Sequence, residues 1–146
     1  MHRNTTFDET TIDNLLEITY RKPQAFLALS LLYDVNNWGR LSFQQDHIFP
    51  KSHIPKDQMN KANRIANLEL LTYDEHARKG DQLPDEWFAQ CDEKFKRDHL
   101  IPLDESLYRL DKFDKFIEER EILIKERLKN LFTEFRQTSG EISHQS

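Results

Sequence analysis

The chain has 146 residues, a single cysteine and a formal net charge of −5 at neutral pH. This length suits one domain with a buried core, and one cysteine excludes a disulfide framework and a cysteine-rich zinc site. No apolar run is long enough to cross a bilayer, and no basic region followed by a hydrophobic one opens the chain. We therefore expect a soluble cytoplasmic protein with no membrane partner.

The first part of the chain, 1–38, is expected to be a helical lead-in. A short helix is predicted over 11–20. Pro23 then opens a second helix over 24–34, because proline suits the first helical position and the apolar residues that follow recur at helical spacing. Residues 36–39, Asn-Asn-Trp-Gly, are expected to form a turn into a strand. The apolar residues of the second helix are Ala25, Phe26, Leu29, Leu32 and Tyr33.

Two short strands are expected inside 39–82. The first is predicted over 40–48 and the second over the apolar run 68–71. Alternation along the first strand would send Asp46 and His47 to opposite faces of a sheet. The turn that follows this strand must therefore redirect one of the two side chains.

A helix is expected immediately after the second strand. Thr72 is followed three residues later by Glu75, which is the pattern of a capping box and marks the start of a helix. His76 then lies in the first or second turn of this helix, and Lys79, three residues further on, shares its face. A strand, a loop, a strand and a helix thus follow one another.

Further helices are expected over 83–137. Pro84 opens one that ends before Pro102. Over 105–135, apolar residues recur every three or four positions, which predicts one long amphipathic helix or two helices with a break. We expect the apolar stripe to pack on the core, and the alternative is a homodimer or docking on a partner domain. The polar segment 138–146 is expected to be disordered.

Together these elements predict an α+β fold that is mainly helical. One domain is expected over 1–137, with the helical lead-in over 1–38, a ββα core over 39–82 and the C-terminal helices over 83–137.

A small set of polar residues has the chemistry of a one-metal phosphodiesterase. Hydrolysis needs a water deprotonated near neutral pH, and the ordinary pKa of histidine lies in that range, so His47 is the expected general base. Asp46 and His76 could hold a divalent cation that neutralises the charge growing on the phosphoryl group. Lys79 is expected to reach a phosphate bound at that cation. The remaining histidines, His2, His53, His99 and His144, are expected to be surface or structural residues.

Basic residues gather around these candidates. From Lys51 to Lys79, six basic residues stand against four acidic ones, although the whole chain is acidic. Lys51, Arg78 and Lys79 are the expected phosphate contacts, and the alternative for each is an ordinary solvated charge. The acidic remainder predicts that the chain alone binds nucleic acid weakly and that another domain or subunit supplies much of the affinity.

The candidates belong to a longer sequence motif. Asp46-His47-Ile48-Phe49-Pro50-Lys51-Ser52 is followed by Asn67-Leu68-Glu69-Leu70-Leu71 and then by His76 and Lys79. This pattern resembles the HNH nucleases, which are also known as the ββα-metal or His-Me finger family. It looks most like the C-terminal HNH domain of GmrSD-like restriction proteins. The resemblance is specific over 41–87 and looser in the flanking helices.

The resemblance implies a role for each matching position. His47 would be the base, Asp46 a metal ligand and His76 a second ligand on the helix. Asn67 would hold the loop between the strands and help to orient the base. Asn63 competes for that role, but Asn67 directly precedes the leucine-rich strand, as the motif requires. The relatives often carry asparagine where His76 stands, and this departure leaves the metal open between Mg or Mn and the alternatives Ni or Zn.

The resemblance further implies a metal-dependent endonuclease that hydrolyses DNA, leaves a 5′-phosphate and a 3′-hydroxyl, and restricts foreign or modified DNA. Its partner would be a nucleotide-dependent regulatory domain or subunit, since the chain has no Gly-rich phosphate loop. The alternatives are a catalytically silent HNH scaffold that docks DNA or protein, and a nuclease that acts on RNA. The intact set of motif residues argues against the silent scaffold.

Overall fold

The structure, a computed structural model, describes residues 3–33 and 43–145. As the sequence predicts, these residues form an α+β structure that is mainly helical and contains a two-stranded sheet. The predicted turn over 36–39 and the start of the first strand over 40–42 lie outside the described residues. The elements are α1 (Arg3–Leu16), α2 (Pro23–Ser30), β1 (Phe43–His47), α3 (Met59–Ala62), β2 (Leu68–Thr72), α4 (Tyr73–Lys79), α5 (Pro84–Phe88), α6 (Glu93–Asp98) and α7 (Phe113–Gln145).

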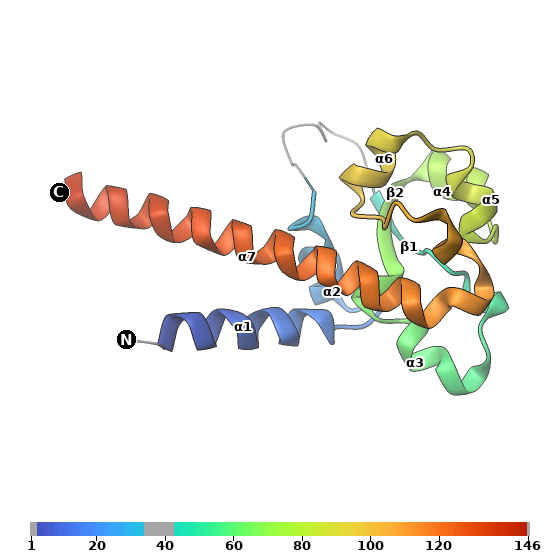
Figure 1. Cartoon of the computed structure of the whole chain (residues 1–146), viewed down its shortest axis with the longest axis horizontal. Helices are drawn as coiled ribbons and strands as arrows, with labels where there is room; N and C mark the ends of the chain where they lie inside the picture. The colour runs from blue at the N-terminus through green and yellow to red at the C-terminus, as the bar shows by residue number, and fades with distance from the viewer. Residues whose placement is uncertain (1–2, 34–42, 146) are drawn as a thin grey trace.

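The two strands bring the two halves of the motif side by side. β1 and β2 pair antiparallel, and Asp46 lies opposite Glu69 while His47 lies opposite Leu68. Short helical turns, including α3, connect the strands, and α4 begins directly after β2 (Figure 1). The chain therefore follows the expected order of strand, loop, strand and helix.

Apolar side chains hold this unit against α7. Leu68 and Leu71 of β2 are fully buried. Phe49, just after β1, packs its ring edge-to-face on Phe113 and Phe116 of α7, at centroid distances of 5.1 and 5.2 Å. Such aromatic pairs stabilise a core through the apolar area they bury and through their ring geometry. This part of the core therefore lies between the sheet and the first half of α7, and buried residues of α1, α2 and α5 continue it.

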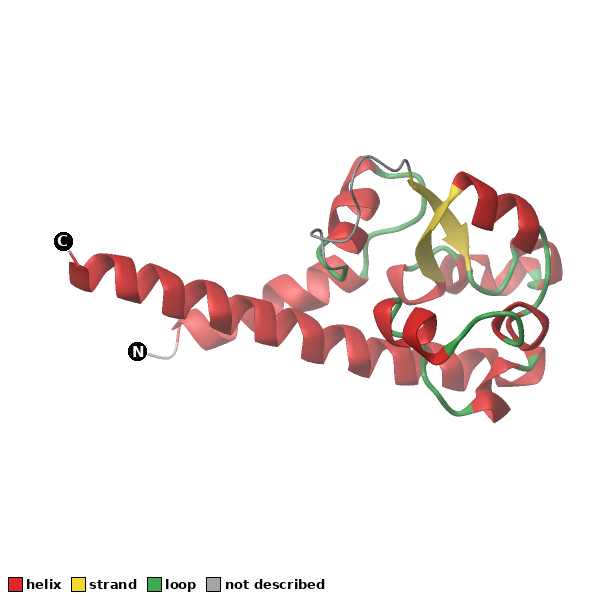
Figure 2. Cartoon of the chain, turned by 90° about the horizontal axis from the view of Figure 1, so that it is seen from above, coloured by secondary structure: helices red, strands yellow, loops and turns green. Residues whose placement is uncertain are grey.

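The long helix α7 carries its apolar stripe into this core as far as Leu128. Further on, Phe135 is 72 % exposed. There α7 runs away from the sheet, with α1 packed alongside it (Figures 1 and 2). The prediction of a buried stripe is thus confirmed for the first half of the helix. None of the described helices combines the length and the apolarity that crossing a membrane requires.

Arg120 lies in the buried stripe of α7 and is fully buried. Its guanidinium donates hydrogen bonds to four backbone carbonyls, at 2.6 to 3.1 Å, so its charge is solvated by the backbone rather than by water. These bonds tie α7 to the segment that leads into β2 and to the end of α6. The four carbonyls belong to Ile65, Ala66, Leu68 and His99.

Several boundaries differ from those that the sequence predicts. The helix expected from Pro84 is two helices, because the side chain of Asp92 accepts a hydrogen bond from the backbone N–H of Phe95 and starts α6 anew. The long helix begins at Phe113, after two 3₁₀ turns, rather than at 105. It continues to Gln145, so 138–145 is helical rather than disordered, because an established helix propagates far more easily than it nucleates.

Candidate functional site

The end of β1 and the first turns of α4 contact each other through the carboxylate of Asp46 and the imidazole of His76. Thr72 and Glu75 form the predicted capping box, in which each side chain accepts a hydrogen bond from the other residue's backbone N–H. This cap starts α4 at the end of β2 and carries His76 toward β1. Asp46 Oδ1 then lies 3.2 Å from His76 Nδ1. Asp46 is buried, whereas the His76 side chain is 42 % exposed, so the pair opens to solvent on the histidine side.

Lys79 lies beneath this pair rather than beside solvent. It is 1 % exposed, and its ammonium group donates a hydrogen bond of 2.8 Å to the carbonyl of His47. The same nitrogen lies 3.1 Å from Asp46 Oδ2. Lys79 lies one turn after His76 on α4, but its side chain points into the protein, so its charge offsets the buried carboxylate. This position does not fit the expected contact with a phosphate.

His47 has the protonation state that a base requires. Its Nε2 lies 2.8 Å from Asn63 Oδ1. An amide oxygen only accepts hydrogen bonds, so Nε2 carries the proton and Nδ1 holds the lone pair. Burial lowers the pKa of His47 below its ordinary value, and the bond to Asn63 opposes part of this effect. The imidazole is therefore neutral at neutral pH and able to accept a proton at Nδ1.

Asn67 is fully buried and bonds only to backbone. Its side-chain oxygen accepts from the N–H of Phe49, and its amide nitrogen donates to the carbonyls of Phe49 and Ala62. Asn67 thus holds the loop, as the motif implies, but it does not touch the ring of His47. The residue that does so is Asn63, the competitor that sequence position disfavoured. The spacing of residues along the chain could not predict this contact, because the turn after α3 determines whether Asn63 or Asn67 faces the ring of His47.

Glu69 is a buried acid that the sequence did not single out. It lies directly opposite Asp46 in the sheet and is fully buried, and neither of its oxygens accepts a hydrogen bond from a described residue. Burial, followed by the charge of Asp46, raises the pKa of Glu69 well above its ordinary value. Burial and the neighbouring carboxylate therefore favour the protonated form of Glu69. The sequence feature that could have predicted this buried acid is the position of Glu69 inside the apolar run 68–71.

Two candidate phosphate contacts are exposed. The ammonium of Lys51 lies over the ring of Tyr20 at 5.2 Å, and the guanidinium of Arg78 lies over the ring of Trp87 at 5.8 Å. Neither cation forms an ion pair with a carboxylate of the described residues. Both charges are therefore available to an anion from outside.

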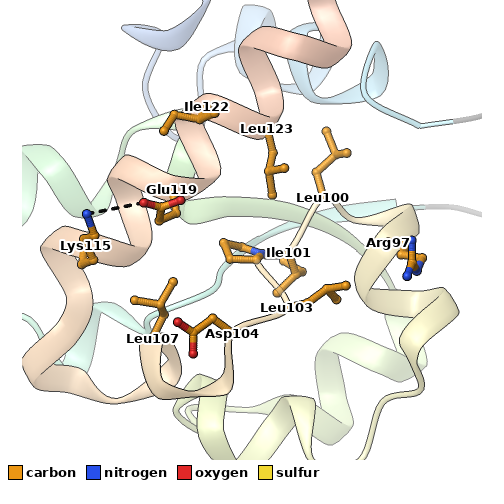
Figure 3. Close-up of a pocket in the computed structure, with 11 residues that line it drawn as sticks. Arg97, Leu100, Ile101, Leu103, Asp104, Leu107, Lys115, Glu119, Ile122 and Leu123 are labelled. Atoms are coloured by element: carbon orange, nitrogen blue, oxygen red, sulfur yellow. Dashed lines mark ion pairs between the residues drawn. The ribbon is translucent and has the colours of Figure 1, made fainter.

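A well-formed cavity lies away from this site. A hollow of about 650 Å³ is bounded by the chain after α6 and by one side of α7, with Leu103, Leu107, Ile122 and Leu123 on its walls (Figure 3). None of the motif residues lines it. The candidate site is instead an open pair of side chains, which suits a bulky polymer better than an enclosed small molecule.

The donors at Asp46 and His76 fit one divalent cation. Their separation of 3.2 Å is that of a hydrogen bond between the two side chains, and it is also close to the roughly 3 Å between two atoms that bind one ion at roughly 2.0–2.2 Å. The other oxygen of Asp46 is buried and is paired with the ammonium of Lys79 at 3.1 Å. The described part of the chain contains no cluster of three or more His, Cys, Asp or Glu side chains placed for metal binding. The pair would therefore leave most coordination positions to water and substrate.

Comparison with known proteins adds no family to these observations. No protein-family model matches the chain, and no curated protein sequence matches it.

Proposed function

We propose that the chain is a metal-dependent HNH endonuclease that hydrolyses DNA phosphodiester bonds and acts in the restriction of foreign or modified DNA. The observation that carries this proposal is the meeting of Asp46 and His76 at the end of β1, the strand that also carries the neutral imidazole of His47. A ligand pair beside a base is the minimum equipment for hydrolysis at one metal.

The residues of the site would divide the reaction between them. Nδ1 of His47 takes a proton from the attacking water, and Asn63 stabilises the resulting imidazolium by accepting from Nε2. Asp46 and His76 hold the divalent cation, Mg or Mn with Ni or Zn as alternatives, which when bound supplies positive charge to the phosphate. Lys79 keeps the Asp46 carboxylate in place through its ion pair.

The surroundings of the site supply charge for a nucleic acid. Lys51 and Arg78 are exposed, and no carboxylate of the described residues neutralises them. Their contacts with phosphates would position the substrate without reading its sequence. A nucleotide-dependent regulatory domain or subunit, as in GmrSD-like systems, would supply further affinity to this acidic chain. A homodimer through the exposed end of α7 is the alternative partner.

A plasmid-nicking experiment tests the proposal. Purified protein is incubated with supercoiled plasmid and Mg, Mn, Ni or Zn, beside His47→Ala and the matched control His53→Ala, whose imidazole is exposed and contacts only the Asp81 carbonyl. We expect cleavage that needs metal and falls roughly 100-fold or more in His47→Ala but not in the control. Equal cutting by wild type and His47→Ala would refute the assignment of the base.

A parallel digestion of RNA separates the two substrate classes. The proposed chemistry acts on a phosphate and assigns no residue to the sugar, so this comparison decides between DNA and RNA. We expect cleavage of DNA, on plain or modified plasmid, under conditions that leave RNA intact.

The ion pair of Lys79 with Asp46 favours a second candidate function. A fixed ammonium 3.1 Å from the ligand oxygen competes with a metal for the carboxylate, as in a catalytically silent HNH scaffold that docks DNA or protein. Titration calorimetry with Mn distinguishes the two. Binding that disappears in His76→Ala supports the nuclease, and absence of binding to wild type supports the scaffold.

A further inference from the structure

The turn between α1 and α2 lies against the candidate base. The ring of Tyr20 meets the ring of His47 edge-on, with centroids 4.2 Å apart. The backbone N–H of Tyr20 donates a hydrogen bond of 2.8 Å to the carbonyl of Asn63, and Thr19 forms a β-bridge with Arg64. A segment outside the ββα unit is thereby fixed to the loop that holds the base.

Two cations share the ring of Tyr20. The guanidinium carbon of Arg21 lies 5.3 Å from the ring centroid, and the ammonium of Lys51 lies 5.2 Å from it. Both side chains are exposed, and neither forms an ion pair with a described carboxylate, although acids outnumber bases in the chain. The ring attracts each cation, so Tyr20 holds two positive charges beside the candidate base, where anions can reach them.

Arg21 adopts a backbone conformation that arginine disfavours. Its φ is +70°, in the left-handed region where glycine and asparagine are preferred. Arg21 is the third residue of a turn in which the N–H of Lys22 donates a hydrogen bond to the carbonyl of Thr19. The N–H of Arg21 itself donates a hydrogen bond to Gln45 Oε1. Strained backbone conformations of this kind are concentrated at functional sites, where a side chain must be held in one position.

We propose that Arg21 and Lys51 form a phosphate clamp, held by Tyr20, that binds the nucleic-acid backbone next to the phosphate under attack. This inference rests on the proposed function and names the substrate contacts of the same site. Arg21 and Lys51 touch the phosphate, whereas Tyr20 is a positioning residue. The clamp reads charge rather than sequence, because its donors reach the backbone and not the base edges.

Binding of a fluorescein-labelled DNA duplex is measured by anisotropy over a series of salt concentrations, with EDTA present so that no metal is bound and nothing is cut. Arg21→Gln and Lys51→Gln are compared with Lys22→Gln, a matched control whose side chain is exposed in the same turn. We expect each clamp variant to weaken binding about 3- to 10-fold and to lower the salt slope by about one. The control is expected to do neither.

Two further substitutions separate the clamp from a structural role. Tyr20→Phe keeps the ring and is expected to keep wild-type affinity, whereas Tyr20→Leu releases both cations and weakens binding. Arg21→Gly relieves the backbone strain, so its melting temperature is expected to be equal to or above that of wild type while its affinity falls. Lower affinity without lower stability is not the result of a damaged fold.

The outcomes are distinct from those of the nuclease test. Wild-type cleavage with unchanged salt slopes in both clamp variants overturns the clamp alone. Equal losses in Lys22→Gln and Arg21→Gln also overturn it, because they indicate a general effect of charge. Changed slopes in a protein that never cleaves support the clamp while the nuclease fails. A wild-type protein with no affinity for DNA or RNA overturns both.

Discussion

The two asparagines of the loop should fail in different ways when each is replaced by alanine. Asn67→Ala removes a buried side chain that makes three hydrogen bonds to backbone groups of Phe49 and Ala62. Asn63→Ala removes a half-buried side chain that makes one, to the ring of His47. The first bonds fix the loop, and the second fixes the protonated nitrogen of the base.

The magnitudes follow from burial. Each net hydrogen bond contributes roughly 1 kcal/mol, and a buried group left without a partner costs about 1–3 kcal/mol, so Asn67→Ala should lose about 3–4 kcal/mol of the free energy of unfolding. For a chain of this length that corresponds to a melting temperature lower by roughly 10 °C. Asn63→Ala should lose less than about 1 kcal/mol, because solvent reaches the imidazole it leaves.

Thermal unfolding by circular dichroism and plasmid cleavage are measured on the same two variants. We expect Asn67→Ala to melt early, and Asn63→Ala to melt near wild type while cleaving at least about tenfold more slowly, because the ring of His47 loses the acceptor that orients it and stabilises its imidazolium. Similar melting temperatures for both variants would refute the reasoning on burial. Wild-type cleavage by Asn63→Ala would refute its role in orienting the base.

Three further predictions concern Arg120, His99 and the cap of α4. Arg120→Met should lower the free energy of unfolding by roughly 3–5 kcal/mol, because four buried carbonyls lose their donor. A loss below about 1 kcal/mol in urea denaturation would contradict this. Burial lowers the pKa of His99 from 6.5 to about 3. Between pH 6.5 and 3 the histidine is protonated in the unfolded chain but not in the folded one, so the free energy of unfolding should fall as the pH drops through this range. Urea melts at several pH values should show a weaker fall in His99→Gln. Thr72→Ala should lower the free energy of unfolding by about 1 kcal/mol and weaken Mn binding at His76, because the capping box positions the start of α4. An unchanged Mn affinity in titration calorimetry would show that the cap does not position His76.

Local patterns were enough to predict the elements that carry the candidate site. Alternating and apolar runs indicated both strands, and the Thr72 and Glu75 pair predicted the start of α4, because a capping box is formed by residues three apart. The periodic apolar residues of 105–135 predicted a long amphipathic helix with a buried stripe, and its first half does pack on the sheet. Such signals are readable because they arise within one or two turns of chain.

The sequence by itself therefore determined the order of the elements and the residue types gathered at 46–79. Only the tertiary structure decided which partners these residues have. It turned Lys79 inward to Asp46, placed Asn63 rather than Asn67 on the ring of His47, and set Glu69 opposite Asp46 without solvent. It also brought Tyr20 and Arg21 to the base from a turn more than twenty residues earlier. The physical reason is that burial and long-range pairing set charge, orientation and tautomer, and neither is encoded in local spacing.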